Sequence, residues 1–340
     1  MGRYLFPAAM LLAAALGRSA DVQADENKPS ADRPPANLKI PTLGGKQFWA
    51  DERFFHGWHI QRNVLTGHCR LLDERNVRHA WGTLEHCRQQ LDRIKREQKL
   101  PPMRGKAVIC LHGLGRSPSA MTKMAKFLAD KGGYTVINVA YPSTRAGIGE
   151  HARTLDQIIT NLDGIEEINF VAHSLGNMVV RHWMGDRSDP QGGAKPDPRV
   201  QRFVMLAPPN NGAQLAKRLG DNKLLRTLIG APLAELGPDW AEFERKLAVP
   251  ACQFGILAGG RGDKKGRNPL LTGDDDLVVS VEETRLAGAR DFAVLPVLHT
   301  FIMDDATVQQ YTLQFLQHGH FVSEPRRRPI AAENAEQKSP

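Results

Sequence analysis

Ser174 has the sequence context of a nucleophilic serine. It is the centre of Ala172-His173-Ser174-Leu175-Gly176, which follows an apolar run and opens a segment with helical spacing. A tight turn from a strand into a helix forces its central residue into a strained backbone conformation and exposes the side chain, which requires small flanking residues. Gly176 fits this requirement, and Ala172 adds only one methyl group. The pattern predicts a nucleophile elbow, although matches this short also arise by chance.

One carboxylate of three is expected to orient a catalytic histidine. Asp274, Asp275 and Asp276 come after a predicted strand and directly precede the apolar run 277–279. Because Asp276 adjoins this run, it is the carboxylate most readily held rigid and partly buried against an imidazole. We expect the other two to be solvated loop carboxylates, with ligands for a calcium ion as the alternative.

His299 is the expected general base. It follows the apolar run 292–295 and precedes a helical pattern at 304–316, so it occupies a loop at the end of a predicted strand. Of the chain's 12 histidines, it alone combines this position with the order serine, acid, histidine, which is typical of a strand–turn–helix nucleophile. His173 is a poor base, since neighbouring side chains at an elbow point apart.

Two backbone N–H groups are predicted to stabilise an oxyanion. One belongs to Leu175, directly after the serine, and the other to Leu114 in the loop Leu111-His112-Gly113-Leu114-Gly115. Such groups stabilise the negative charge that develops when a hydroxyl attacks a carbonyl. For His112 we expect only a local role in shaping this loop. The set of groups would perform acyl transfer through a covalent intermediate, and it implies neither a metal ion nor an organic cofactor.

The elements that must position these residues indicate an α/β sheet. Short, continuously apolar runs suit strands covered on both faces, and segments of helical periodicity separate them. This arrangement predicts a doubly wound, mostly parallel sheet. Strands are expected at 107–111, 135–139, 168–172, 200–206, 251–257 and 292–295, and crossover helices at 119–130, 149–162 and 175–184.

An amino-terminal extension is expected ahead of this core. Residues 46–102 hold aromatic and β-branched residues that predict two or three short strands, followed by a helix at 84–99 with one apolar stripe. The core domain is expected at 103–320. Cys69 and Cys87 share the extension, and an oxidising compartment would permit a disulfide between them, although we favour free thiols. Cys110 is expected to be a small core residue.

Residues 208–250 form a predicted insertion of the core domain. They are too long for an ordinary connection, and helical patterns at 214–219 and 224–229 predict a small cap over the carboxyl ends of the strands. The leucines of this cap either line an acyl pocket or, as we favour, pack the cap on the sheet: Leu215, Leu219, Leu224, Leu225 and Leu228.

Both ends of the chain are expected to lie outside the folded core. Residues 1–24 have a positive start, an apolar stretch and small residues at the end, which predicts a signal peptide and export to the periplasm or medium. An uncleaved anchor is the alternative, although the apolar stretch is shorter than the ~20 residues of a membrane helix. Residues 25–45 predict a disordered linker, and residues 321–340 a basic flexible tail.

Composition narrows the classes of protein and partner. The 340 residues are 41% hydrophobic and 24% charged, which excludes a mostly disordered chain and a multi-span membrane protein. The net charge is +8, but the arginines at 326–328 have no interleaved aromatic residues, so a nucleic-acid partner is not expected. Peripheral contact with a membrane stays open, and the sequence indicates no oligomeric state.

Six motifs lie between Lys106 and Gln317: HGLGRS (112–117), YPSTR (141–145), AHSLGN (172–177), APPNNGA (207–213), DLVVSVEETRL (276–286) and LHTFIM (298–303). With them the chain resembles the bacterial lipase and esterase group of α/β hydrolases. The resemblance implies the α/β-hydrolase fold, a triad of Ser174, Asp276 and His299, oxyanion donors at Leu114 and Leu175, and a small-molecule or lipid ester as substrate. Two residues depart from it, because many relatives have glycine at the positions of Ala172 and Leu277.

Two other functions compete with ester cleavage at this point. A thioesterase or an amidase would use the same groups on a different carbonyl. A binding protein with the same fold would need none of the three side chains, and the presence of all three speaks against it.

Overall fold

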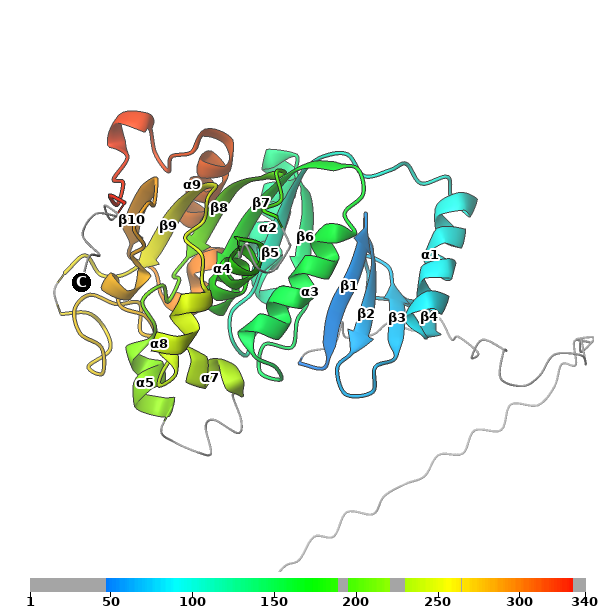
Figure 1. Ribbon diagram of the computed structural model, residues 1–340. Coiled ribbons are helices and arrows are strands. Elements are labelled where there is room, and N and C mark those ends of the chain that lie inside the picture. Colours follow the sequence, from blue (N-terminus) through cyan, green and yellow to red (C-terminus); the bar gives the residue numbers. More distant parts are fainter. Residues whose placement is uncertain (1–46, 189–194, 221–229, 264, 333–340) are drawn as a thin grey trace, which may run out of the picture. The chain divides into compact units, whose positions relative to one another are not determined.

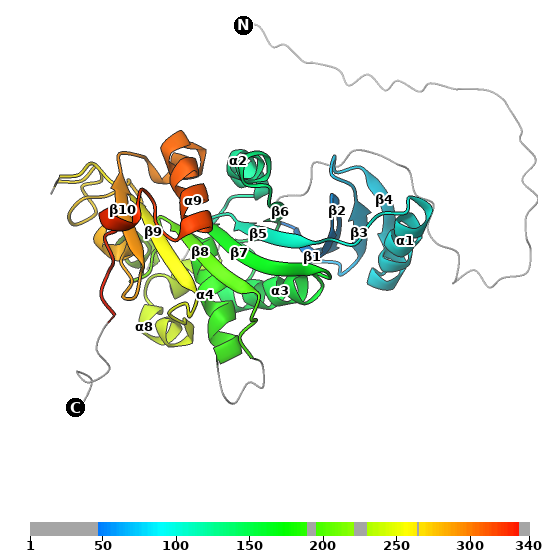
Figure 2. The ribbon, with the colours of Figure 1, turned by 90° about the horizontal axis from the view of Figure 1, so that it is seen from above.

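Two β-sheets organise the structure. A computed structural model describes residues 47–188, 195–220, 230–263 and 265–332, all within one unit that spans residues 36–340. The first sheet has four antiparallel strands, and the second has six parallel strands (Figures 1 and 2). The predicted signal peptide and linker, residues 1–24 and 25–45, lie outside the described residues.

The amino-terminal extension is a four-stranded meander followed by helix α1. Its strands pair in chain order, so each contacts the next along the sequence. We predicted two or three strands. The additional strand escaped detection because β3 is buried at all four positions and therefore shows no alternation of apolar and polar residues. The elements are β1 (Trp49–Phe55), β2 (Trp58–Asn63), β3 (Cys69–Leu72), β4 (Arg78–Gly82) and α1 (Leu84–Glu97).

The second sheet confirms the predicted parallel core. Each of the six expected runs forms a strand, and the spatial order is β10-β9-β8-β7-β5-β6. All neighbours pair in parallel, which places the carboxyl ends of all six strands at one edge. The strands are β5 (Gly105–Leu111), β6 (Thr135–Val139), β7 (Ile165–His173), β8 (Val200–Leu206), β9 (Gln253–Gly259) and β10 (Asp291–Leu295).

Helices cover both faces of this sheet, as the continuously apolar strands predicted. In β5, Ile109 belongs to one buried cluster with residues of α3 and α4, and Cys110 belongs to a second cluster with residues of α2 and α9. Figure 2 shows α2 and α9 on the side opposite α3 and α4. The helices are α2 (Thr122–Gly132), α3 (Ile148–Thr160), α4 (Leu175–Ser188) and α9 (Ala306–His318).

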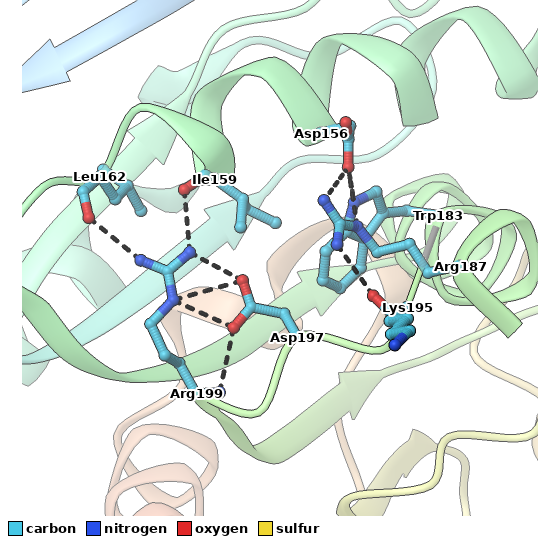
Figure 3. Close-up of polar contacts among 8 residues, drawn as sticks. All are labelled: Asp156, Ile159, Leu162, Trp183, Arg187, Lys195, Asp197 and Arg199. Atoms are coloured by element: carbon cyan, nitrogen blue, oxygen red, sulfur yellow. Dashed lines mark hydrogen bonds and ion pairs between the residues drawn. The ribbon is translucent and has the colours of Figure 1, made fainter. Parts of the chain in front are cut away.

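Arginine side chains tie α3, α4 and the start of β8 together (Figure 3). The Arg199 guanidinium pairs with the Asp197 carboxylate at 2.7 Å and donates to the carbonyls of Ile159 and Leu162. Ile159 belongs to the last turn of α3 and Leu162 lies just beyond it, so these bonds add donors at the carboxyl end of the helix, where carbonyls lack helical partners. A second group joins α3 to α4, because the Asp156 carboxylate accepts from Trp183 Nε1 and Arg187 Nε, each at 2.8 Å.

The described part of the insertion is helical, as predicted for a cap. It contains α5 (Gln214–Gly220), α7 (Ala231–Glu235) and α8 (Trp240–Phe243). The helical pattern expected at 224–229 lies outside the described residues, as do Leu224, Leu225 and Leu228. Of the five leucines considered above, Leu215 is the one whose side chain the structure describes, and it is half-buried.

Arg181 in α4 fastens the insertion at both of its ends. Its guanidinium donates to the Ala248 carbonyl at 2.9 Å and to Asn210 Oδ1 at 3.0 Å. Arg181 is 3% exposed, and burial lowers the pKa of its guanidinium to about 10. A buried cation that loses its partners is costly, so these contacts fix where the insertion leaves and rejoins the core.

Residues 321–332 are packed against β10, so the expectation of a flexible tail over this stretch is wrong. The Asp291 carboxylate accepts from the backbone N–H groups of Phe321 at 2.8 Å and Arg328 at 2.9 Å. Phe321 is buried in the core, and Ile330 exchanges backbone hydrogen bonds with Gly288 and Ala289. The buried Asp291 carboxylate and the buried Phe321 ring therefore hold a segment whose basic composition had indicated a flexible tail. Residues 333–340 lie outside the described part.

All four cysteines are free thiols. Cys69 and Cys87 are both buried in the extension, where burial raises the pKa of the Cys87 thiol to about 12. Cys110 is fully buried in β5, as predicted for a small core residue. Within the described ranges, no helix combines the length and apolar character needed to cross a membrane.

Candidate active site

Ser174 occupies a strained turn between β7 and α4. Its φ angle is +52°, a left-handed conformation that residues with a side chain rarely adopt. Its N–H donates to the Leu206 carbonyl at the end of the neighbouring strand β8, at 2.9 Å. Ser174 is half-buried, whereas the residues on either side, His173 and Leu175, are buried. The turn therefore presents the serine side chain alone at the carboxyl edge of the sheet.

Two glycines allow the loop after β5 to approach this turn. A Cβ on Gly176 would lie 2.9 Å from the carbonyl oxygen of His112, and a Cβ on Gly113 would lie 3.1 Å from Ser174 Cβ. The second of these would also lie 2.9 Å from the Nδ1 atom of His173. Contacts this short leave no room for a side chain at either position, so glycine is what allows the loop and the serine turn to approach this closely.

Asp276 and His299 form a buried hydrogen-bonded pair. His299 Nδ1 lies 2.7 Å from Asp276 Oδ2, and the His299 N–H donates to the Asp276 carbonyl at 3.0 Å. The second carboxylate oxygen of Asp276 accepts from the N–H groups of Val278 and Val279. The Asp276 side chain is fully buried, and that of His299 is 8% exposed. Both the position of the ring and its tautomer, with the proton on Nδ1, follow from this contact.

Asp274 and Asp275 both accept hydrogen bonds from backbone N–H groups. Asp275 is fully buried and accepts from the N–H groups of Arg267, Asn268 and Leu277, so its expectation as a solvated carboxylate is wrong. Asp274 is half-buried and accepts from the N–H groups at 261 and 262. Apart from that of Leu277, the donors come from residues 261–268, so the burial of these carboxylates depends on a loop contact that no local sequence pattern indicates. In the part of the chain that the structure describes, no three His, Cys, Asp or Glu side chains are grouped to hold a metal ion.

The serine turn lies against the histidine through His173. The rings of His173 and His299 are 4.7 Å apart, and both ring nitrogens of His173 lack a hydrogen-bond partner among the described residues. Burial, with the nearby His299 as a second cause, lowers the pKa of His173 well below its ordinary value. No hydrogen bond joins Ser174 Oγ to His299 in the described structure, and such contacts are often long before substrate binds.

The two predicted oxyanion donors lie on opposite sides of the contact between loop and turn. Leu175 is the first residue of α4, where the helix has no acceptor for its N–H. Leu114 follows Gly113 in the loop. Among the described residues, neither N–H group has a hydrogen-bond acceptor, whereas the next one along the loop, that of Gly115, donates to Ser143 Oγ at 3.0 Å. The dipole of α4 adds a partial positive charge at the same place.

An aromatic stack beneath the loop was missed by the sequence analysis. The rings of His112 and Tyr141 are parallel and 4.2 Å apart, and the Tyr141 hydroxyl donates to the His112 carbonyl. The ring of His151 also packs against Tyr141, with ring centroids 5.0 Å apart. Burial lowers the pKa values of His112 and His151 to about 4, so both rings are neutral. The motif YPSTR at 141–145 was the available signal for this stack.

Exposed apolar side chains lie in the loops that carry the acid and the histidine. Phe301 is 57% exposed, Leu270 47% and Leu277 42%. Leu270 and Leu277 are joined through Asn268, whose side chain donates to the Leu277 carbonyl and accepts from the Leu270 N–H. Leu277 directly follows Asp276, and Phe301 lies two residues after His299.

The chain is similar to a protein family and to several solved structures. Residues 108–333 match the model of the alpha/beta hydrolase family. The chain is similar to the lipase BlEst2 of Bacillus licheniformis in its mature form, with 19% identity, coverage of 64% of this chain and 94% of that chain, and a TM-score of 0.48. It is also similar to the phospholipase PlaB of Legionella pneumophila in complex with thio-NAD, with 21% identity, coverage of 62% and 58%, and a TM-score of 0.46. No curated protein matches the sequence.

The family model spans well over half of the chain and includes the strained serine turn, the loop after β5 and the pair of acid and histidine. The chain therefore belongs to the alpha/beta hydrolase family.

Proposed function

We propose that this protein is a serine hydrolase that cleaves carboxylic esters, with Ser174 as nucleophile, His299 as general base and Asp276 as the orienting acid. The observation that carries the proposal is the buried Asp276–His299 pair, which sits in the same edge of the sheet as a serine held at φ +52°. Backbone strain of this kind persists only where the surrounding structure enforces it, and it concentrates at functional sites.

The proposed reaction proceeds through an acyl-enzyme. His299 Nε2 takes the hydroxyl proton of Ser174 as the oxygen attacks the carbonyl carbon of the ester, and the N–H groups of Leu114 and Leu175 stabilise the resulting oxyanion. The imidazolium then returns the proton to the departing alcohol. Water, activated by the same histidine, attacks the acyl-enzyme and releases the acid. Asp276 holds the ring and stabilises its charged form throughout.

The proposed substrate is an ester with an apolar acyl group. Phe301, Leu270 and Leu277 offer apolar contact beside the acid and histidine, which a carboxylic ester with a hydrocarbon chain would use. A thioester would be attacked by the same groups. An amide requires stronger protonation of its leaving group, so it ranks behind the two.

Labelling with a fluorophosphonate tests the nucleophile. The wild-type protein should be modified at Ser174, and Ser174→Ala or His299→Ala should abolish the labelling. Matched controls are Ser188→Ala and His318→Ala, which replace exposed residues of the same types at the ends of α4 and α9. Both controls should label like the wild type. A series of p-nitrophenyl esters of increasing chain length then measures the acyl preference.

The competing function is that of a binding protein with the same fold. It would leave the folded wild type inert towards the fluorophosphonate and towards every ester, thioester and amide in the series. Labelling at a residue other than Ser174 would show a hydrolase with a different nucleophile. Either result contradicts the proposed triad.

We also propose that the protein is exported, on the strength of residues 1–24. Mass spectrometry of the mature protein should find its amino terminus near Asp25, in the periplasm or medium. A cytosolic protein that retains Met1 would contradict export without bearing on the chemistry.

A further inference from the structure

The amino-terminal extension reaches the loop that carries the candidate oxyanion donor Leu114. Gln47, just before β1, donates from Nε2 to the Arg116 carbonyl at 2.8 Å and to Ser143 Oγ at 3.3 Å. The same Ser143 oxygen accepts the Gly115 N–H at 3.0 Å. One side chain of the extension thus contacts the residues on the carboxyl side of Leu114, directly at Arg116 and through Ser143 at Gly115.

The other end of the Gln47 amide is fixed as well. Its Oε1 atom accepts from the Thr144 N–H at 3.0 Å and from Thr144 Oγ1 at 2.8 Å. The backbone of Gln47 has a φ of +54°, in the left-handed region that residues with a side chain rarely adopt. The amide therefore has a defined orientation, with its oxygen on Thr144 and its nitrogen on Arg116 and Ser143.

A second contact anchors the extension beside the first. In β1, the Asp51 N–H donates to the Ala140 carbonyl at 2.9 Å, and Asp51 Oδ2 accepts the Ala140 N–H at 2.6 Å. Asp51 is 1% exposed, and its other oxygen accepts from Gln61 of β2. Ala140 directly follows β6 and precedes the segment 141–145, so this pairing holds the start of the segment that Gln47 contacts.

Arg116 carries the contact onward to the histidine loop. Its guanidinium donates to the Thr300 carbonyl at 3.3 Å, and Thr300 directly follows His299. The Arg116 N–H also closes a turn on the Gly113 carbonyl at 3.2 Å. A shift of Arg116 would therefore displace both the loop of Leu114 and the residue next to His299.

From these contacts we infer that the amino-terminal extension is a positioning element of the active site, and that Gln47 is the residue through which it holds the loop of Leu114. The inference rests on the proposed function for its kinetic consequence. Oxyanion donors act only when they are fixed at the place where charge develops, so a brace on their loop contributes to the rate although it touches no substrate.

Two substitutions of Gln47 separate the two ends of its amide. Gln47→Ala removes every contact, whereas Gln47→Glu keeps an oxygen for Thr144 and replaces the donor at Arg116 by an acceptor that faces a carbonyl. We expect kcat for a p-nitrophenyl ester to fall about 10-fold in both variants with little change in KM, because a loop misplaced by part of an ångström loses transition-state contacts first. Thr144 keeps its partner in the second variant, so the loss is assigned to the nitrogen.

The matched control is Arg53→Ala. Arg53 also joins the extension to the core domain, through Asp163 at 3.7 Å, but this pair does not touch the loop of Leu114. Its kcat should equal that of the wild type. Hydrogen–deuterium exchange of peptides covering residues 112–117 provides a readout that needs no activity, and it should become faster in both Gln47 variants and stay unchanged in Arg53→Ala.

Each outcome decides the inference. Slower turnover with faster exchange limited to residues 112–117 supports it, and wild-type kcat or wild-type exchange in the Gln47 variants overturns it. A Gln47 variant whose exchange rises across the whole chain shows a general loss of stability instead and also overturns it. Faster local exchange in a protein whose wild type cleaves no ester and takes no fluorophosphonate would leave the brace in place and overturn the proposed function alone.

Discussion

Asp275 and Asp276 are adjacent in the chain, yet their buried carboxylates bind different parts of the structure. Asp276 holds the His299 ring through Oδ2 at 2.7 Å, whereas Asp275 accepts the backbone N–H groups of Arg267, Asn268 and Leu277. The first contact orients a proposed catalytic group, and the second closes the loop that carries it. Leu277, with φ +87°, is the strained residue that follows both.

The contact between Asp276 and His299 predicts the effect of Asp276→Asn. An amide can present its N–H₂ to His299 Nδ1 and thereby favour the tautomer with its proton on Nε2, which cannot accept the proton of Ser174. We expect kcat to fall about 10⁴-fold with the fold intact, as expected when a triad acid becomes an amide. Ester hydrolysis and circular dichroism measure the two quantities. Asp274→Asn is the control, and an equal loss there would show that the acid is misassigned.

The hydrogen bonds of Asp275 predict a loss of stability when it is replaced. Asp275→Ala leaves three backbone N–H groups without their acceptor inside the protein, so we expect the free energy of unfolding to fall by about 2–4 kcal/mol. Urea denaturation measures the change. Asp263 also accepts two backbone N–H groups but is exposed, so water replaces its side chain and Asp263→Ala should cost far less. Equal stability of Asp275→Ala and the wild type would disprove the structural role.

The parallel core could be predicted because its pattern is dense and local. In β5, successive residues such as Ile109 and Cys110 enter two different cores, so the strand is apolar at consecutive positions and stands out from its surroundings. The turn at Ser174 was equally visible, since the residues that a strained strand-to-helix turn requires lie within five positions of one another. Constraints between residues this close in the chain can be predicted from the sequence alone.

Contacts between distant polar residues could not be predicted in the same way. Gln47 and Thr144 are 97 positions apart, and no local pattern around Gln47 indicates a partner in the loop that follows β6. The burial of Asp275 and the packing of residues 321–332 against Asp291 were not predicted for the same reason. A charged side chain is expected to be solvated unless its backbone donors are known.

The close approach of Gly113 to the serine turn predicts that this position tolerates no side chain. In Gly113→Ala, the new methyl would lie 2.9 Å from His173 Nδ1 and 3.1 Å from Ser174 Cβ, so the loop and the turn must separate. We expect kcat to fall about 100-fold, the order of loss that misplaced reacting groups produce. Gly67→Ala is the control, since it is strained at φ +73° but meets nothing within 4 Å. Wild-type kcat in Gly113→Ala would refute the contact.

The neutral His151 beneath the loop predicts a specific response to acid. Burial first, and the nearby His112 second, lower the pKa of His151 to about 4, below the ordinary value of 6.5 that applies in the unfolded chain. As the pH falls from 6.5 to 4, the unfolded chain therefore binds this proton before the native protein does, and the native state loses about 1.4 kcal/mol of stability per pH unit from this residue.

The variant His151→Phe keeps a buried ring but removes the group that titrates. The free energy of unfolding of this variant, measured in urea and compared with that of the wild type, should rise relative to it as the pH falls through this range. A difference that stays constant from pH 7 to pH 4 would show that His151 takes up its proton equally in both states, which its burial against Tyr141 does not permit.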